Sequence, residues 1–351
     1  MLNNWINPVL ATPYLSKLIE QKFNSFVFPD QLHRDDHSFQ VALIGAEGHT
    51  ATIRDAFYRL NFSSLNCTFT DLGDARNNDP SFMTAAYTEL VEQNIFPIVL
   101  DPSSNTSLAI ANSLKGLDLD NDLGVISPNT AVNSPTHKLL CSILDGDKVN
   151  LISLVAYQKH FANPTRQELP RLDYSAMLSL GKLRDDFTEV EPILRSLSSL
   201  MFDVKSIRAS DSIGIKNQYN IGLFIEEACK LLQYACASNK LRALHITGYD
   251  LLDDTKSGAE LIAYLIWYCL NGRAKALVDP TAKDQMTSFI VDLTNLNEQL
   301  KFWKNETNLQ WWVEIPSGGS KLNLVPCSEK EYSLATENII SDRLFHLLGR
   351  S

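Results

Sequence analysis

The sequence lacks the features that mark a nucleic-acid-binding or membrane protein. It has no basic run longer than one or two residues, and 31 Lys and Arg face 41 Asp and Glu, which gives a formal net charge of −10. Phosphate backbones are bound by clustered Lys and Arg, so nucleic acid is not expected as a partner. No apolar run approaches the roughly 20 residues that a membrane-spanning helix needs. We therefore expect a soluble protein that does not span a membrane.

Cysteines are few and scattered. The six cysteines form no C-x-x-C pair, and several lie in apolar runs, as Cys269 does within Ala-Tyr-Leu-Ile-Trp-Tyr-Cys-Leu. This distribution favours buried, reduced thiols over disulfides or a zinc site. The first residues show no cationic segment followed by an apolar core, so no signal peptide is expected. Both observations predict a cytoplasmic location.

The motifs of nucleophilic catalysis and of nucleotide binding are missing as well. The chain contains no Gly-x-Ser-x-Gly elbow, no P-loop and no Gly-x-Gly-x-x-Gly turn. Each of these motifs places a nucleophile or a phosphate against a strand-to-helix turn. A serine hydrolase or a nucleotide-binding enzyme of these types is therefore not expected.

What the chain does contain is an alternation of short apolar runs with longer helix-like segments. This rhythm predicts an α/β fold with a mainly parallel sheet that is covered on both faces. The expected strands are residues 39–44, 66–72, 95–100, 123–126, 149–155, 199–204 and 241–246. The expected helices are residues 52–60, 80–93, 221–238 and 260–271. In such sheets ligands bind at the carboxyl ends of the strands, so the polar residues after each apolar run are the candidate site.

The two ends of the chain are less regular. Residues 1–38 hold one amphipathic segment, at 15–23, and are expected to pack on the sheet as an N-terminal extension. Beyond Val278, residues 288–293 and 311–315 have the composition of strands. Because no repeat, low-complexity tract or Pro/Gly-rich linker interrupts the chain, residues 1–351 are expected to form a single domain.

One segment resembles a known metal-binding signature. From Met201 the sequence is Met-Phe-Asp-Val-Lys-Ser-Ile-Arg-Ala-Ser-Asp-Ser. It resembles the signature of the ureohydrolase family of arginase, agmatinase and formiminoglutamase, in which Asp-x-Asp at a strand end bridges two manganese ions. Here Asp203 keeps the first position and Lys205 replaces the second aspartate. A lysine ammonium between two divalent cations would be strongly repelled.

The other metal positions that the resemblance implies are also changed. Where the family has a histidine after its third strand, this chain has Ser104. Where the family has Asp-Ala-His-x-Asp-x-Asn, the chain has Ser127, Asn129 and Ala131 at the three ligand positions, followed by a matching Asn133. The family's substrate-binding glutamate corresponds to Gly248. Residues 127, 129 and 131 thus carry no family ligand, and Asp203 alone is retained.

The resemblance nevertheless extends over most of the chain. It includes the segments 71–74, 206–211 and 258–266, together with Phe302-Trp-Lys, Trp311-Trp-Val-Glu-Ile-Pro and Val325-Pro-Cys-Ser near the C-terminus. These segments are similar to a formiminoglutamase-like branch of the family. The resemblance implies a three-layer α/β/α sandwich with a mainly parallel, arginase-like sheet.

Several residues allow two interpretations. Asp203 is expected to pair with Lys205, Arg208 or another cation rather than to bind metal, and Arg208 to hold a loop. The cluster at residues 33–37, which contains His33, Asp35, Asp36 and His37, is interpreted as a solvated loop, with a metal site as the alternative. His49 and His160 follow predicted strands and are interpreted as ordinary hydrogen-bonded histidines that could face the cleft. His245 is expected in the core, and Trp311 and Trp312 are expected to pack.

The sequence therefore predicts a non-catalytic formiminoglutamase-like homologue that has lost its dimanganese site and has no cofactor. It would bind either a small molecule or a protein partner. A small molecule would lie in the cleft that corresponds to the family's active site, with Asn133, His160 and Arg208 as candidate cleft residues. The protein could also form a homo-oligomer. The alternative is an active Mn²⁺-dependent hydrolase of a linear amidine such as formiminoglutamate, agmatine or arginine. A third hypothesis keeps one cation at Asp203 with Asn129 and Asn133, a site with too little charge to hold Mn²⁺ tightly.

Overall fold

The computed structural model describes residues 5–9, 40–46, 50–104, 106–173, 176–252, 256–276, 286–294, 298–317 and 321–349. The predicted helix at 15–23, the cluster at 33–37 and His49 lie outside these ranges. The strands are β1 (Ile6–Asn7), β2 (Val41–Gly45), β3 (Phe69–Ala75), β4 (Phe96–Leu100), β5 (Asp122–Ile126), β6 (Leu151–Tyr157), β7 (Leu178–Ser179), β8 (Ser199–Asp203), β9 (Ala243–Thr247), β10 (Met286–Leu293), β11 (Glu298–Asn305), β12 (Trp311–Ser317) and β13 (Lys321–Cys327). The α-helices are α2 (Thr50–Phe57), α3 (Pro80–Glu92), α4 (Ser107–Gly116), α5 (Pro135–Asp145), α6 (Leu180–Asp185), α7 (Val190–Arg195), α8 (Ile225–Cys236), α9 (Ser257–Ala276), α10 (Glu329–Thr336) and α11 (Asp342–Leu348), with short 3₁₀ turns η4 (Phe187–Glu189) and η5 (Val204–Ser206).

The larger sheet has nine strands in the order β1-β3-β2-β4-β9-β8-β5-β6-β7. Every pairing in it is parallel except that of the edge strand β1 with β3. The central strands β2, β4, β8 and β9 are buried along their whole length. Such strands need helices on both faces, because neither face can meet water. The predicted mainly parallel sheet is confirmed.

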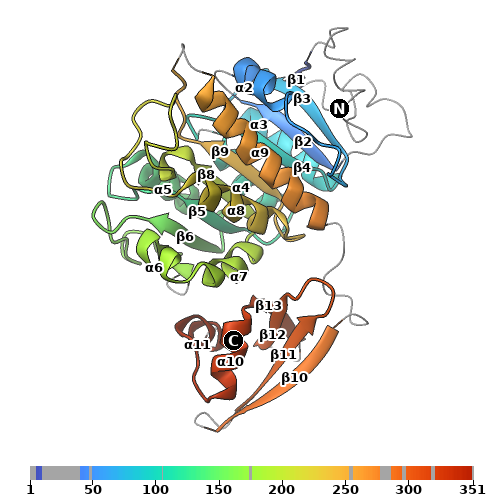
Figure 1. Cartoon of the computed structure of the whole chain (residues 1–351), viewed down its shortest axis with the longest axis vertical. Coiled ribbons are helices and arrows are strands. Elements are labelled where there is room, and N and C mark those ends of the chain that lie inside the picture. The colour runs from blue at the N-terminus through green and yellow to red at the C-terminus, as the bar shows by residue number, and fades with distance from the viewer. Residues whose placement is uncertain are drawn as a thin grey trace.

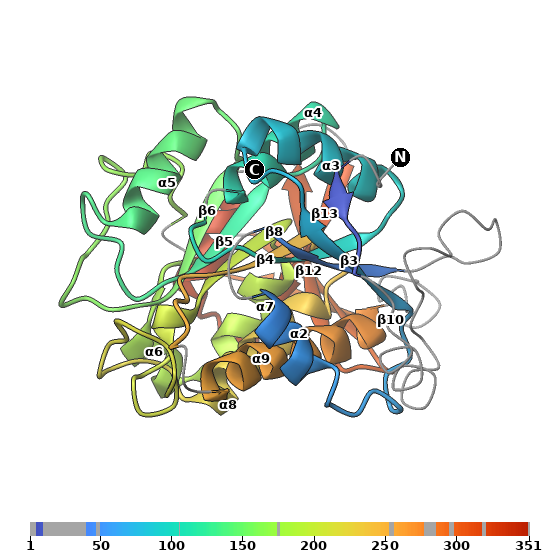
Figure 2. The ribbon, with the colours of Figure 1, turned by 90° about the horizontal axis from the view of Figure 1, so that it is seen from above.

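Alternate residues of each strand pack against different helices. In β2, Val41 and Leu43 join a core cluster with α2, α7, α8 and α9, while Ala42 and Ile44 join one with α3 and α4. Farther along the sheet, α5 covers the same face as α4 through Leu140. Figure 2 shows α3, α4 and α5 on one side of the sheet and α2, α8 and α9 on the other. The fold is therefore the predicted three-layer α/β/α sandwich.

Helix boundaries follow local capping chemistry. Ser134 accepts a hydrogen bond from the backbone N–H of His137, and Pro135 occupies the first turn of α5. Asp79 and Pro80 begin α3 in the same way. Proline is favoured there because its missing N–H would have no partner at a helix start. Among the described residues, no helix is long and apolar enough to cross a bilayer.

Five of the six cysteines are buried, and Cys141 is partly exposed. Burial raises the pKa of the Cys67 thiol to about 11 and that of Cys229 to about 12. A thiol with a raised pKa carries little thiolate at neutral pH and is a poor nucleophile. These residues therefore act as small apolar side chains of the core.

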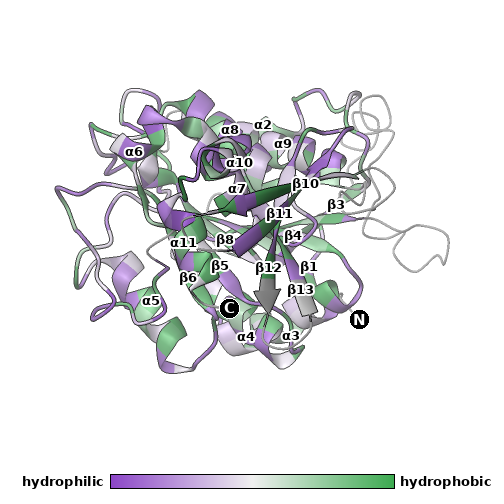
Figure 3. Cartoon of the chain, turned by 90° about the horizontal axis from the view of Figure 1, so that it is seen from below, coloured by the Kyte–Doolittle hydropathy of each residue, from purple (hydrophilic) through white to green (hydrophobic). Residues whose placement is uncertain are grey.

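A second sheet follows the first in sequence. Strands β10 to β13 form an antiparallel sheet in chain order, and α10 and α11 follow them. Phe302, Val313, Ala335 and Leu344 lie in a core cluster of this C-terminal unit that is separate from those of the large sheet. Figure 1 shows the unit at the end of the molecule, and Figure 3 shows both hydrophilic and hydrophobic residues along β10 and β11. The predicted strands at 288–293 and 311–315 are confirmed, and β11 and β13 were not predicted.

Arg195, at the end of α7, connects the two parts. Its side chain is 5% exposed, pairs with Glu191 and donates hydrogen bonds to the carbonyls of Trp311 and Cys327. The guanidinium group also lies 4.4 Å from the ring centroid of Trp312. Both tryptophans are buried, as predicted. A side chain of the large-sheet region thus provides hydrogen bonds to two backbone carbonyls of the C-terminal sheet.

Candidate functional site

The carboxyl ends of four central strands meet at one edge of the large sheet. Ile126 at the end of β5 pairs with Phe202 of β8, and Asp203 of β8 pairs with Thr247 of β9. The backbone N–H of Asp101, after β4, donates to the carbonyl of Ile246. The structure therefore brings together the segments after β4, β5, β8 and β9, as expected for parallel neighbours.

Asp203 is the one carboxylate at the centre of this edge. Its side chain is buried, accepts a hydrogen bond from the Ser127 hydroxyl (2.9 Å) and accepts another from the backbone N–H of Lys205 (2.9 Å). The Ser127 hydroxyl in turn lies 3.0 Å from that of Thr136 on α5. Burial raises the pKa of Asp203, and the two hydrogen bonds and the charge of Lys205 oppose this only partly. The carboxyl group thus has uncharged donors as direct partners.

The expected ion pairs of Asp203 are not formed. Neither the Lys205 ammonium nor the Arg208 guanidinium makes a salt bridge to it within the described residues. Arg208 instead donates to Asp211 (2.7 Å) and lies 4.1 Å from the ring centroid of Phe224. The prediction of a paired Asp203 was wrong, whereas the loop-holding role of Arg208 is confirmed. Arg208 pairs with Asp211, three residues farther along the same loop, instead of with Asp203, five residues before it.

Gly248 lies directly against Asp203. Its φ is +73°, and a Cβ placed on it would lie 1.9 Å from Asp203 Oδ1. Its backbone N–H donates to the carbonyl of Pro102. Left-handed backbone and absence of space both require glycine here. A side chain at this position would need Asp203 to move away.

The segment after β4 is a tight turn organised by Asp101. The buried carboxylate of Asp101 accepts hydrogen bonds from the Ser103 hydroxyl and from both the backbone N–H and the hydroxyl of Thr106. Ser104 sits in this turn with φ of +64° and donates its backbone N–H to the carbonyl of Asp101. Asp101 therefore serves to shape the turn before α4, a role that the sequence analysis did not assign.

The segment after β5 is also held by local hydrogen bonds. Asn129 accepts the backbone N–H of Ala131 on its side-chain oxygen, and its amide lies 3.5 Å from the Tyr219 hydroxyl. Asn133 is exposed with φ of +70°, a conformation that asparagine tolerates, and it directly precedes the Ser134 cap of α5. Asn133, which agrees with the family pattern, is thus a turn residue on the surface.

His160 follows β6 and is exposed. Its ring packs on Phe161 (4.4 Å between centroids), which packs on Tyr219. Beside it a surface depression of about 500 Å³ is lined by residues after β6, by α6 and by Ile221. Lys159 and the stem of α6 at Lys182 line this depression. Of the candidate cleft residues, His160 lines it.

A buried polar cluster lies beneath the strand ends. His245 of β9 is 1% exposed, as predicted, and its Nδ1 is 3.2 Å from the hydroxyl of Ser107. The edge of its ring meets the ring of Tyr87 (5.6 Å), and within the part of the chain that the structure describes His245 Nε2 has no hydrogen-bond partner. Burial lowers the pKa of His245 to about 4, despite the opposing charge of Asp101. The imidazole is therefore neutral, and its burial keeps it from contact with any substrate.

The donor set at this edge does not fit a pair of manganese ions. Hard divalent cations need several oxygen ligands, chiefly carboxylates. At the positions that the family resemblance assigns to metal ligands, the side chains are the hydroxyls of Ser104 and Ser127, the amide of Asn129, one carboxylate and one ammonium. The other buried carboxylate of this edge, Asp101, is taken up by the turn before α4. Among the described residues, no group of three or more His, Cys, Asp or Glu side chains could hold a metal ion.

Comparison with known proteins gives a fold and no sequence family. No family model matches the sequence, and no curated protein does. Three solved structures illustrate the likeness. Agmatine ureohydrolase of Thermoplasma volcanium is 14% identical, with a TM-score of 0.54 over 68% of this chain and 90% of that one. Formimidoylglutamase of Bacillus subtilis is 14% identical, with a TM-score of 0.56 over 70% of this chain and 90% of that one.

The third structure is formiminoglutamase of Trypanosoma cruzi, which contains Mn²⁺. It is 15% identical, with a TM-score of 0.55 over 67% of this chain and 94% of that one. Each of these proteins is matched almost along its whole length, while about a third of this chain has no counterpart in it. The chain therefore has the fold of agmatinase and formiminoglutamase, that of the arginase superfamily.

Proposed function

We propose that this protein is a non-catalytic formiminoglutamase-like homologue whose dimanganese centre has been dismantled. The observation that carries the proposal is the environment of Asp203. The retained carboxylate is buried against the Ser127 hydroxyl, the Lys205 backbone N–H and Gly248. All three neighbours are uncharged groups, two of them donors, and none of them adds negative charge that would help to neutralise a cation at Asp203.

A ureohydrolase centre needs more negative charge than this edge provides. Two divalent ions must be neutralised by several carboxylates before a bridging water becomes acidic enough to supply hydroxide near neutral pH. Asp203 supplies one such charge, and the ammonium of Lys205 belongs to the same strand end. Coulomb repulsion from that ammonium would oppose each cation, most strongly in a partly buried site.

The substrate side of the site supports the same conclusion. A guanidinium or amidine substrate needs a carboxylate that can form charge-assisted hydrogen bonds to it. The position expected to provide that carboxylate is Gly248, whose Cα faces Asp203 so closely that no Cβ fits. The strand ends thus offer neither the metal charge nor the substrate anion of a ureohydrolase.

What remains at this edge is a polar surface for a small molecule or a partner protein. Asn133, His160 and Arg208 are the proposed contact residues, together with the depression beside β6. A cytoplasmic location, assembly as a homo-oligomer and folding of residues 1–351 as a single unit are part of the same proposal. The location rests on the sequence composition, the homo-oligomer on the resemblance to the ureohydrolases, and the single unit on the Arg195 contacts between the two sheets.

The deciding experiment is the metal content of the full chain after incubation with excess Mn²⁺ and desalting, measured by inductively coupled plasma mass spectrometry. We expect far less than one ion per chain and no release of formamide or urea from formiminoglutamate, agmatine or arginine. Two tightly held ions per chain would contradict the proposal and support an active amidine hydrolase.

A restored variant provides the matched control. It combines Ser104→His, Ser127→Asp, Asn129→His, Ala131→Asp and Lys205→Asp, so that each replaced position regains the family's donor. If these are the old metal positions, this variant retains Mn²⁺ under conditions in which the natural chain retains none. If neither protein binds Mn²⁺ although both are folded by circular dichroism, the assignment of these positions is wrong.

A further inference from the structure

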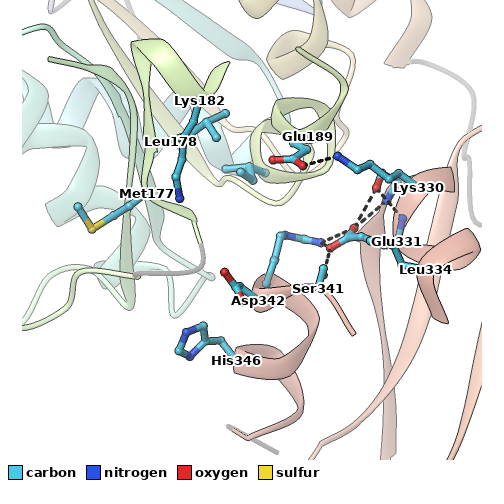
Figure 4. Close-up of a pocket in the computed structure, with 13 residues that line it drawn as sticks. Met177, Leu178, Lys182, Glu189, Lys330, Glu331, Leu334, Ser341, Asp342 and His346 are labelled. Atoms are coloured by element: carbon cyan, nitrogen blue, oxygen red, sulfur yellow. Dashed lines mark hydrogen bonds and ion pairs between the residues drawn. The ribbon is translucent and has the colours of Figure 1, made fainter. Parts of the chain in front are cut away.

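A cavity of about 230 Å³ lies at the junction of the large sheet with the C-terminal unit. One wall is formed by β7, α6 and α7, and the other by α10 and α11, as Figure 4 shows. It shares no residue with the degenerate metal positions. Ligand sites occur preferentially where two structural units meet, because side chains from both can converge there.

The cavity has an apolar side and a fixed charged side. Leu178 and Ile193 from the large-sheet region and Leu334 from α10 supply the apolar surface. On the charged side, Glu331 is 6% exposed and accepts two hydrogen bonds from Arg343. Lys330 pairs with Glu189 across the junction. These charges are already matched, so they shape the cavity without needing a ligand.

Two further charges are not matched. The ammonium of Lys182 projects from α6 on one wall, and the carboxylate of Asp342 projects from α11 on the other (Figure 4). Neither side chain forms a salt bridge or side-chain hydrogen bond with the described residues. A cation and an anion therefore face the same small space from opposite sides without reaching each other.

We propose that this cavity binds a free amino acid with an aliphatic side chain. The carboxylate of the ligand would pair with Lys182, and its ammonium group would pair with Asp342. The side chain would lie on Leu178, Ile193 and Leu334. A volume of about 230 Å³ is below the ~300–1,000 Å³ of pockets for drug-sized ligands, which suits a molecule of this size. The ligand would complete the ionic contacts of the junction and thereby join its two walls.

Calorimetric titration of the full chain with three probes tests the proposal. L-Leucine carries both charges, 3-methylbutylamine lacks the carboxylate, and 4-methylpentanoate lacks the ammonium group. We expect L-leucine to bind about tenfold or more tightly than either analogue, the scale of one charge-assisted hydrogen bond. Absence of L-leucine binding at millimolar concentration overturns the proposal.

Two variants assign each charge to its partner. Lys182→Met should abolish the preference for L-leucine over 3-methylbutylamine, since the carboxylate then has no partner. Asp342→Asn should abolish the preference over 4-methylpentanoate. Lys159→Met, which removes an ammonium group from the depression beside β6, should leave both preferences unchanged. Preferences that persist in Lys182→Met and Asp342→Asn would place the ligand elsewhere and overturn the proposal. Because these measurements do not involve Mn²⁺, their outcome is independent of the metal test.

Discussion

The strand ends of the large sheet and the junction with the C-terminal sheet both bury charged groups, but they neutralise them differently. At the strand ends, Asp203 has a hydroxyl and a backbone N–H as partners and no salt bridge. At the junction, Arg195 is paired with Glu191 and also donates to two backbone carbonyls. One region keeps a buried carboxyl without a counterion, and the other keeps a buried cation with its counterion.

This difference has opposite consequences for stability. Removing one partner of a buried pair leaves an uncompensated charge and is strongly destabilising. Removing a buried carboxyl that has no counterion relieves a desolvation penalty. A bound metal would supply the missing counterion at Asp203. The change in the free energy of unfolding on replacing Asp203 therefore also tests whether a metal binds there. The following variants sharpen this comparison, from the largest expected effect to the smallest.

Arg195→Met should produce the largest loss. It removes the cation paired with Glu191 and leaves the carbonyls of Trp311 and Cys327 without their donor. We expect a loss of about 3–5 kcal/mol in the free energy of unfolding, the usual cost of breaking a buried ion pair. Urea denaturation followed by tryptophan fluorescence measures it. Arg59→Met is the matched control, because Arg59 pairs with Asp55 at the same i,i+4 spacing but on the surface. A loss equal to that of the control would show that the junction does not depend on Arg195.

His245 should make stability depend on pH. Its pKa is about 4 in the folded protein and about 6.5 when unfolded, so the unfolded state binds the proton more readily. The neutral His245 therefore contributes its full share to the free energy of unfolding above pH 6.5. This share is lost as the pH falls towards 4, by on the order of 3 kcal/mol. His245→Gln should flatten the unfolding free energy between these pH values, while His160→Gln, at an exposed position, should not. An identical pH profile for His245→Gln would contradict a neutral, buried imidazole.

Gly248→Ala should be destabilising by about 1–3 kcal/mol, because it combines a left-handed backbone with a clash. The clash is with Asp203, so the loss should be smaller in an Asp203→Ala background. Thermal unfolding of the natural chain, the two single variants and the double variant gives the coupling free energy between positions 248 and 203. Gly116→Ala is the control, since nothing lies within 4 Å of its Cβ position. Additive effects of the two substitutions would mean that Gly248 and Asp203 do not touch.

Asp203→Asn should have the smallest effect and the opposite sign. The folded pKa of Asp203 is raised, so the carboxyl costs stability as the pH rises through that value. Asparagine cannot ionise, and we expect a gain of roughly 1 kcal/mol at neutral pH, the scale of one neutral hydrogen bond. Chemical denaturation at pH 7 with and without Mn²⁺ measures the gain. If the variant is less stable than the natural chain, and if Mn²⁺ stabilises the natural chain, then Asp203 is a metal ligand instead.

The sequence was informative where one periodicity decided the structure. Short runs rich in apolar residues predicted seven of the nine strands of the large sheet, because a strand covered on both faces needs mostly apolar side chains. It was less informative for short elements. Helices α4 and α5 were not predicted, since serine, asparagine or histidine is mixed with their apolar residues, and β11 and β13 are interrupted by charged residues or proline. Their apolar faces became recognisable only once the partner surfaces were present.

At the candidate site, the sequence alone established which chemical groups occupy the positions that correspond to the family's metal ligands: hydroxyls, an amide, one methyl group, one aspartate and one lysine in place of a set of carboxylates and imidazoles. Residue type fixes charge and donor capacity, so it could predict that metal ligands are few. The tertiary structure alone decided the partners. It placed Asp203 beside Ser127 and Gly248, and it placed Arg195 against the C-terminal sheet. Pairing depends on distance and burial between segments remote in sequence, and only the assembled sheets bring those segments together.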